Sequence, residues 1–112
     1  MEIQMAKHEI KTNGKRGEDW AKAILNLNLT ENGLEVNVSL RHGPDPTQQV
    51  NGYLADYVYQ QIRDWLDSMI PVMRITYVNF PAPSINGQWP TLDPLIHSVD
   101  RMGVEVRRRD EV

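Results

Sequence analysis

The chain has 112 residues, a length that suits a single domain with one hydrophobic core. Its formal net charge of −3 differs from the strong positive balance of a typical nucleic-acid-binding protein, and its 40% hydrophobic content argues against bulk disorder. The sequence has no cysteine, which excludes disulfides, thiolate zinc sites and thiol nucleophiles, and it has no apolar stretch near the roughly 18 residues of a membrane span.

Residues 1–18 predict either an N-terminal strand or a flexible segment, because their alternation of apolar and charged residues is weak. As a strand, this segment would turn back at Asn13-Gly14 toward residues 18–24. The segment also lacks the apolar core of a secretory signal, so the cytoplasm is the default localisation.

Residues 25–40 predict a β-hairpin with one apolar face and one wet face. Two alternating runs flank Asn32-Gly33, a pair suited to a two-residue type I′ turn. With this turn the numbers of two paired residues add up to 65. Apolar residues then pair with apolar residues across the two strands: Leu29 with Val36, Leu27 with Val38, and Leu25 with Leu40.

The next segment predicts one long helix of about six turns. Asp45 suits the N-cap, Pro46 suits the first helical position, and Pro71 prevents the helix from continuing. Large apolar side chains recur along this helix at steps of three and four residues. We expect this apolar stripe to lie across the apolar face of the hairpin.

The remainder of the chain predicts a strand, a long connection, a short helix and a final strand. Residues 72–80 are β-branched and aromatic and lie between two prolines, which favours a strand. After the connection 81–92, Asp93 as N-cap and Pro94 begin a helix that Gly103 ends, and residues 104–109 form the last strand.

The predicted fold is an α+β two-layer sandwich. Its sheet is antiparallel or mixed and has four or five strands, with one long and one short helix on one face. The predicted element order is β-β-(β)-α-β-α-β, in a single domain that spans residues 1–112.

Motifs for catalysis, metals and cofactors are missing from the sequence. The histidines, His8, His42 and His97, share no helix face and no metal-ligand spacing. The serines lack a G-x-S-x-G elbow, and the chain has no phosphate loop or dinucleotide fingerprint. We therefore expect a non-enzymatic protein without a cofactor or metal.

Tyr59 and Trp89 are the predicted partner contacts. Tyr59 points off the apolar stripe of the long helix among the charged residues Asp56, Arg63 and Asp67, and such a tyrosine is typical of interfaces. Alternatively, its ring packs along a neighbouring strand edge or is simply exposed. Trp89 lies in the long connection, where it either covers the core or contacts a partner.

These features favour a small protein-binding domain that self-associates through its sheet. Small size and missing catalytic motifs are typical of an inhibitor, an immunity or anti-defence factor, or a minor assembly component of a phage or mobile element. The expected partner is another protein, rather than a nucleic acid or a membrane.

Two alternatives use other residues. The first is nucleic-acid binding through the lysine-rich start, including Lys15 and Arg16, together with Arg107, Arg108 and Arg109; it requires these basic segments to converge in space. Gly14-Lys15-Arg16-Gly17 also fits the G-x-x-G form of a KH-type RNA-binding loop, but the pattern is short and common, and a flexible basic turn is the favoured explanation. The second is a small-ligand binder or enzyme that uses the 81–92 loop with His97 and Asp100, a possible acid–base pair three residues apart.

Overall fold

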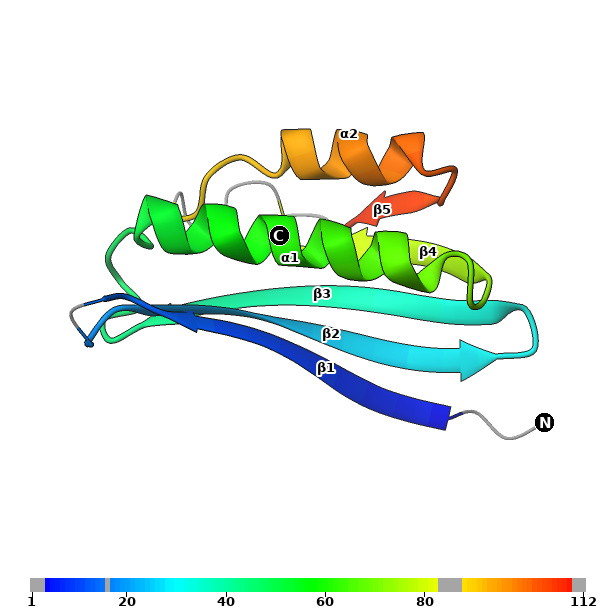
Figure 1. Cartoon of the computed structure of the whole chain (residues 1–112), viewed down its shortest axis with the longest axis horizontal. Coiled ribbons are helices and arrows are strands. Elements are labelled where there is room, and N and C mark those ends of the chain that lie inside the picture. Colours follow the sequence, from blue (N-terminus) through cyan, green and yellow to red (C-terminus); the bar gives the residue numbers. More distant parts are fainter. Residues whose placement is uncertain (1–3, 16, 83–87, 110–112) are drawn as a thin grey trace.

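The computed structural model in Figure 1 describes residues 4–15, 17–82 and 88–109. Its first three strands, β1 (Gln4–Asn13), β2 (Trp20–Thr30) and β3 (Gly33–Gly43), form an antiparallel sheet in sequence order. The strands β4 (Ile75–Phe80) and β5 (Val106–Arg108) extend this sheet in the parallel sense. The sheet is therefore mixed, with the strand order β1-β2-β3-β4-β5.

The two helices connect the parallel strands and lie on one face of the sheet (Figure 1). Helix α1 (Gly52–Met69) leads from β3 to β4, and α2 (Asp93–Arg101) leads from β4 to β5. This arrangement confirms the predicted α+β sandwich and its element order. In the part of the chain that the structure describes, no helix is long and apolar enough to cross a membrane.

Alternation along the strands and a stripe along α1 build the core between the two layers. Ala21, Ala23 and Leu25 of β2 are completely buried. Small alanines at two of these positions let α1 approach the sheet, and Ile62 and Leu66 of α1 are also fully buried there. The long helix therefore covers the apolar face of the hairpin, as its sequence predicts.

The predicted register of the hairpin is wrong by two residues. Thr30 pairs with Gly33 and Leu29 with Leu34, so Glu31 and Asn32 form the turn. The Thr30 hydroxyl stabilises this closure because it donates to the Gly33 carbonyl and accepts from the Asn32 N–H, both at 3.1 Å. A shift of two residues keeps every side chain on its predicted face, so the apolar and wet faces are unchanged.

The predicted caps of both helices are also corrected. Asp45 caps a turn, where its carboxylate accepts from the Thr47 N–H at 2.9 Å, while α1 begins later with Asn51 as its N-cap. Helix α2 begins at Asp93, but the Asp93 N–H donates to the Thr91 hydroxyl at 3.2 Å instead of its own side chain capping the helix. Gly103, with a φ of 84°, ends this helix as predicted.

Candidate functional site

The face of the sheet opposite the helices is the strongest candidate site. Among the described elements, both helices lie on the other face, so the outward side chains of β1, β2 and β3 have no layer above them (Figure 1). Alternation directs the residues between the buried positions of these strands onto this open face. We define the open face by its cationic and aromatic members, which are Lys7, Lys11, Trp20, Lys22, Arg41, Tyr77 and Arg107.

One end of the open face carries a tryptophan among cations. Lys11, Lys22 and Arg41 lie in register across β1, β2 and β3. The ammonium nitrogens of Lys11 and Lys22 lie 5.4 and 5.7 Å from the ring centroid of Trp20, within the range of a cation–π interaction.

Gly43 holds the Trp20 ring close to the sheet. It is the register partner of Trp20 on β3, and a Cβ at this position would lie 2.5 Å from the indole ring. The glycine therefore allows the ring to rest on the backbone of β3, where a larger residue would push it away.

The other end of the open face carries a tyrosine under an arginine. The Arg107 guanidinium of β5 lies 4.0 Å from the ring centroid of Tyr77 on β4. The Arg107 Nε also contacts a carboxylate oxygen of Glu105 at 2.5 Å. The planar guanidinium is thus oriented by a ring on one side and a carboxylate at its edge, which leaves a flat cationic surface toward solvent.

Amide side chains occupy the space between the two aromatic ends. Asn26, Asn37 and Asn79 are neighbours across β2, β3 and β4, and the Asn79 amide donates to Asn37 at 3.1 Å. Asn28 donates to Glu35 at 2.8 Å, while its own carbonyl oxygen has no hydrogen-bond partner among the described residues. This middle region therefore offers amide donors and acceptors, and its one carboxylate, Glu35, accepts a hydrogen bond from Asn28.

Charge is separated between the two faces of the molecule. The carboxylates of the open face, Glu9, Glu35 and Glu105, are outnumbered by its cations, and each contacts a cation or amide of the same face. The helix face has the opposite balance, with Asp56, Asp64 and Asp67 on α1 and Asp93 and Asp100 on α2 against Arg63, Arg101 and Arg108. The net charge of −3 is therefore the sum of a basic open face and an acidic helix layer.

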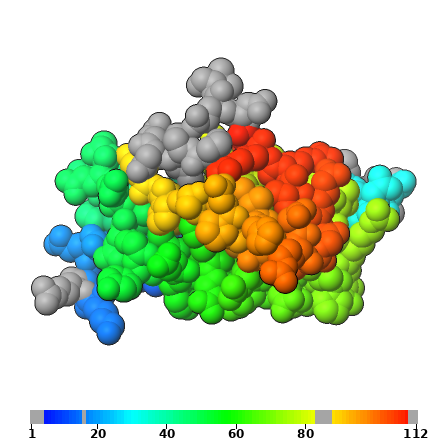
Figure 2. Space-filling model, turned by 90° about the horizontal axis from the view of Figure 1, so that it is seen from above, coloured from blue at the N-terminus to red at the C-terminus, as the bar shows by residue number. Residues whose placement is uncertain are grey.

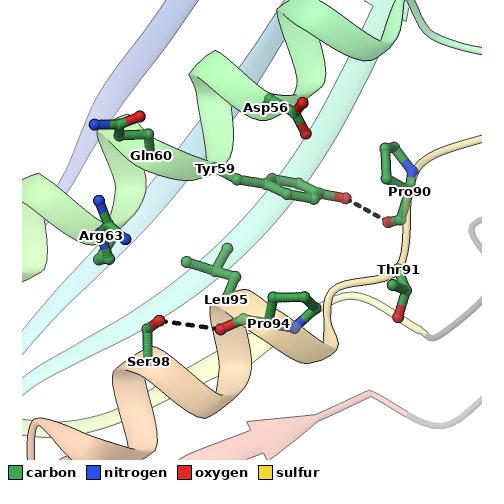
Figure 3. A pocket seen from close by; sticks show the side chains of 9 residues that line it. All are labelled: Asp56, Tyr59, Gln60, Arg63, Pro90, Thr91, Pro94, Leu95 and Ser98. Atoms are coloured by element: carbon green, nitrogen blue, oxygen red, sulfur yellow. Dashed lines mark hydrogen bonds between the residues drawn. The ribbon is translucent and has the colours of Figure 1, made fainter.

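A groove lies on the helix face between α1 and the start of α2. Figure 2 shows this face, with α2 in orange alongside α1 in green. The groove has a volume of about 340 Å³ and is lined by Asp56, Tyr59 and Arg63 from one side and by Pro90, Thr91 and Leu95 from the other (Figure 3). Of the predicted contact residues, the structure brings Asp56, Tyr59 and Arg63 together here, whereas Asp67 is exposed on α1 without lining the groove.

Tyr59 is fixed in this groove by its neighbours. Its hydroxyl donates to the Pro90 carbonyl at 2.8 Å (Figure 3), and its ring stacks on Trp89 with centroids 5.8 Å apart. Burial raises the pKa of Tyr59, and the negative charge of Asp56 raises it further, while Arg108 opposes them. The ring is therefore a neutral, rigid wall of the groove at ordinary pH.

Trp89 is buried beneath Tyr59, with 6% of its surface exposed. Its indole N–H donates to Nδ1 of His42 at 3.2 Å, and His42 Nε2 lies 2.6 Å from the Gln48 carbonyl. Of the two alternatives for Trp89, this packing matches the one in which it covers the core. A partner that binds at this end of the molecule would contact Tyr59 and Pro90, which form the surface above Trp89.

The basic residues of the nucleic-acid alternative converge only in part. Arg107 joins the open face, but Arg108 points to the helix side, where it contacts Asp93 at 3.2 Å. Arg109 is half-buried and donates to the Val38 carbonyl, and burial lowers its pKa. Lys15 is exposed in the turn between β1 and β2, and Arg16 lies outside the described residues.

Of the residues of the small-ligand alternative, the structure brings His97 and Asp100 together but not Trp89, and residues 83–87 of the 81–92 loop lie outside the described residues. His97 and Asp100 line a shallow depression beside Arg107 and Arg108, while Trp89 is buried against His42. Across the described ranges, no three histidine, aspartate or glutamate side chains are placed to hold a metal ion.

No family model, curated protein or solved structure matches this chain. Sequence reasoning did not single out Trp20, Arg41 and Tyr77, although a signal was present: Trp20 has the same strand parity as Lys22, which places both on one face.

Proposed function

We propose that this protein binds single-stranded nucleic acid along the open face of its sheet. One observation carries the proposal: cations from β1, β2, β3 and β5, distant in sequence, converge on an uncovered surface around two aromatic rings. Basic surfaces whose aromatic side chains stack on unpaired bases are a common solution for holding single strands.

The acidic helix layer does not cancel this surface. Screening at physiological salt reduces charge interactions beyond about 8 Å, and a helix with its side chains is about 10 Å thick. The carboxylates on the outside of α1 and α2 are therefore more than one screening length from a strand on the opposite face. They orient the protein toward a polyanion instead of preventing binding.

The shape of the open face favours a single strand over a duplex. Five strands at about 4.8 Å spacing make a sheet roughly 19 Å wide, which exceeds the major groove width of about 12 Å. A duplex also hides its bases from Trp20 and from the Arg107–Tyr77 pair, whereas each stacked base contributes about 1 to 3 kcal/mol in single-strand complexes.

The two aromatic ends define the length of the site. Trp20 pairs with Gly43 and Tyr77 pairs with Glu35, so the ends are eight positions apart along β3. At about 3.3 Å per residue this separation is roughly 26 Å. A segment of several nucleotides therefore spans both ends, with its phosphates near the lysines and its bases near the asparagine row.

Binding of fluorescent oligonucleotides of about 12 nucleotides tests the proposal. Mixed-sequence RNA and DNA single strands should bind at low salt, and the matching duplexes should bind more weakly. The variant Lys22→Gln/Arg107→Gln should weaken single-strand binding. The variant Arg63→Gln/Arg101→Gln removes the same charge from the helix face and should not.

Two results would contradict nucleic-acid binding on the open face, and a third would contradict the choice of a single strand. The first is the absence of binding at about 50 mM salt, where phosphate contacts are strong. The second is an equal loss in the two variants, which would indicate a non-specific response to net charge. Tighter binding to duplex than to single strands would show that the ligand is a nucleic acid but not a single strand.

Protein binding through the helix-face groove is the second candidate. The rigid Tyr59 ring, supported by Trp89 and flanked by Asp56 and Arg63, favours it. In a pull-down, a genuine groove partner should be lost with Arg63→Glu and retained with Lys22→Gln/Arg107→Gln. A partner that both variants retain does not use the groove.

A further inference from the structure

We infer that a second copy of this chain pairs with the free edge of β1, and that the two sheets join into one. The pairing is antiparallel, with His8 at the two-fold axis and Lys7 of each copy opposite Glu9 of the other. This inference concerns assembly and does not rest on the proposed function.

The first observation is that β1 is a long edge strand that lacks a bulge and a proline, two of the features that usually protect a sheet edge. All of its residues from Gln4 to Asn13 pair with β2 in one uninterrupted register, so no bulge twists the edge away. The strand contains no proline. Its outer backbone groups form a row of donors and acceptors, which is a template for another strand. The opposite edge, β5, has only three residues.

The second observation is the spacing of charges along this edge. Lys7, Glu9 and Lys11 alternate in sign on the open face of β1. Like charges directly opposite each other destabilise a strand pair, and opposite charges stabilise it. The strand is therefore self-complementary only in registers that place Glu9 against a lysine.

Geometry limits those registers further. Only every second residue of β1 points its backbone N–H and C=O away from β2. When β1 pairs with its own copy, each such residue must lie opposite another of the same kind, so the numbers of two paired residues add up to an even number. A sum of 14 sets Lys7 against Lys7, and a sum of 18 sets Glu9 against Glu9. A sum of 16 places Lys7 of each copy opposite Glu9 of the other and pairs residues 4–12. A sum of 20 places Glu9 opposite Lys11, but it pairs only residues 7–13.

The register with a sum of 16 also covers the most exposed apolar side chain of the edge. Met5 is 82% exposed, and this register places it opposite Lys11, whose aliphatic stem can cover it. On the helix side, Ala6 lies opposite Ile10, and His8, which stacks on Trp65 with centroids 5.4 Å apart, lies next to its own copy. Both open faces then lie on the same side of one continuous sheet.

Analytical ultracentrifugation over a wide range of concentrations tests the pairing. The wild-type chain should reach the mass of a dimer. Lys7→Glu places two carboxylates opposite each other and should shift the chain to monomer, and Glu9→Lys should do the same with two ammonium groups. The double variant Lys7→Glu/Glu9→Lys should dimerise again, since its charges match in reverse.

Mixing the two single variants is the sharpest form of the experiment. Their heterodimer places glutamates opposite lysines at both positions, so two monomeric samples should combine into a dimer. Mixing also distinguishes the contact between the two β1 strands from the contact of Glu9 with Lys22 of the same chain, at 3.8 Å. Mixing two variants cannot restore a contact within one chain. Circular dichroism of each variant verifies that the fold is retained.

Three outcomes would overturn the inference. A wild-type chain that stays monomeric at every concentration has no such dimer. Single variants that dimerise as well as the wild type place the contact elsewhere. A loss of the dimer with Lys11→Glu but not with Lys7→Glu would show that the two β1 strands pair in the register with a sum of 20. Arg107 lies on β5, at the opposite edge of the sheet from β1, so Arg107→Gln can weaken oligonucleotide binding without altering the pairing edge, and the two proposals can fail independently.

Discussion

The indole N–H of Trp89 donates to Nδ1 of His42, and the two rings meet edge to face with centroids 5.9 Å apart. Since Nδ1 accepts this bond, the imidazole proton lies on Nε2 and is donated to the Gln48 carbonyl at 2.6 Å. One buried histidine thus fastens both the segment after β3 and the segment before α2 to the end of the sheet.

Trp89→Phe should therefore destabilise the fold while leaving its shape intact. The change keeps an aromatic ring but removes the donor to His42, and an unpaired buried acceptor costs about 1 to 3 kcal/mol. Urea denaturation followed by circular dichroism measures the loss. Trp20→Phe, at a half-buried position on the open face, is the matched control and should cost less. An unchanged midpoint for Trp89→Phe would contradict the proposed role of this hydrogen bond.

Gly43→Ala should weaken oligonucleotide binding without unfolding the protein. The added Cβ would lie 2.5 Å from the Trp20 ring, so the ring must leave its place on the sheet. We expect a shift in tryptophan fluorescence and a several-fold loss of affinity. Gly52→Ala is the control, because a Cβ there meets nothing within 4 Å. Equal affinities for the two variants would show that the position of Trp20 does not matter.

The neighbouring residues Arg107 and Arg108 should respond differently to the same substitution. Arg107 lies over Tyr77 on the open face, whereas Arg108 contacts Asp93 on the helix side at 3.2 Å. Arg107→Gln should reduce single-strand affinity several-fold, and Arg108→Gln should leave it within error in the same anisotropy assay. The opposite order would place the nucleic acid on the helix face.

Tyr59 should make the fold sensitive to strongly alkaline pH. Burial, and next the charge of Asp56, raise the pKa of Tyr59 above its ordinary value of 10.0. The folded state then holds the phenol proton when the unfolded chain releases it. This stabilising contribution is complete below pH 10.0 and is lost as the pH rises toward the raised value.

The comparison with Tyr59→Phe isolates this effect from the titration of other groups. The variant loses the bond to Pro90, and its free energy of unfolding should fall less steeply than that of the wild type as the pH rises above about 10. Urea denaturation at several pH values measures both slopes. Identical slopes would mean that Tyr59 titrates alike in the folded and unfolded chains.

The layers of the fold follow from local patterns, and its register does not. The parity of Leu25, Leu27 and Leu29 assigns a face to every hairpin residue whichever pairs form. The turn itself depends on a distant strand, because a Cβ on Gly33 would lie 2.7 Å from the Arg74 carbonyl. This glycine therefore also makes room for the approach to β4, a requirement that no local turn pattern reveals.

The start of α1 shows a similar limit. Asp45 and Asn51 are both good capping residues, and sequence alone favours the one followed by proline. Long-range contacts decide the question: His42 binds the Gln48 carbonyl, and the Val50 N–H donates to Gln88 at 3.0 Å. These contacts hold residues 48 and 50 out of the helix.

The candidate site depends on which strands are neighbours. Parity places Lys11 and Lys22 on outward faces of their strands, but the row that they form with Arg41 requires the pairing of β1 with β2. The weak alternation of residues 1–18 left that pairing as only one of two alternatives. The stacking of Arg107 on Tyr77 likewise requires β4 and β5 to be adjacent.

The salt dependence of single-strand binding tests the central claim most directly. For single strands, the slope of log K against log[salt] is about −0.7 for each phosphate that the protein neutralises. Removing Lys22 and Arg107 together should reduce the magnitude of this slope by about 1.4, while Arg63→Gln/Arg101→Gln should leave it unchanged. Equal slopes for the wild type and the Lys22→Gln/Arg107→Gln variant would contradict binding along the open face.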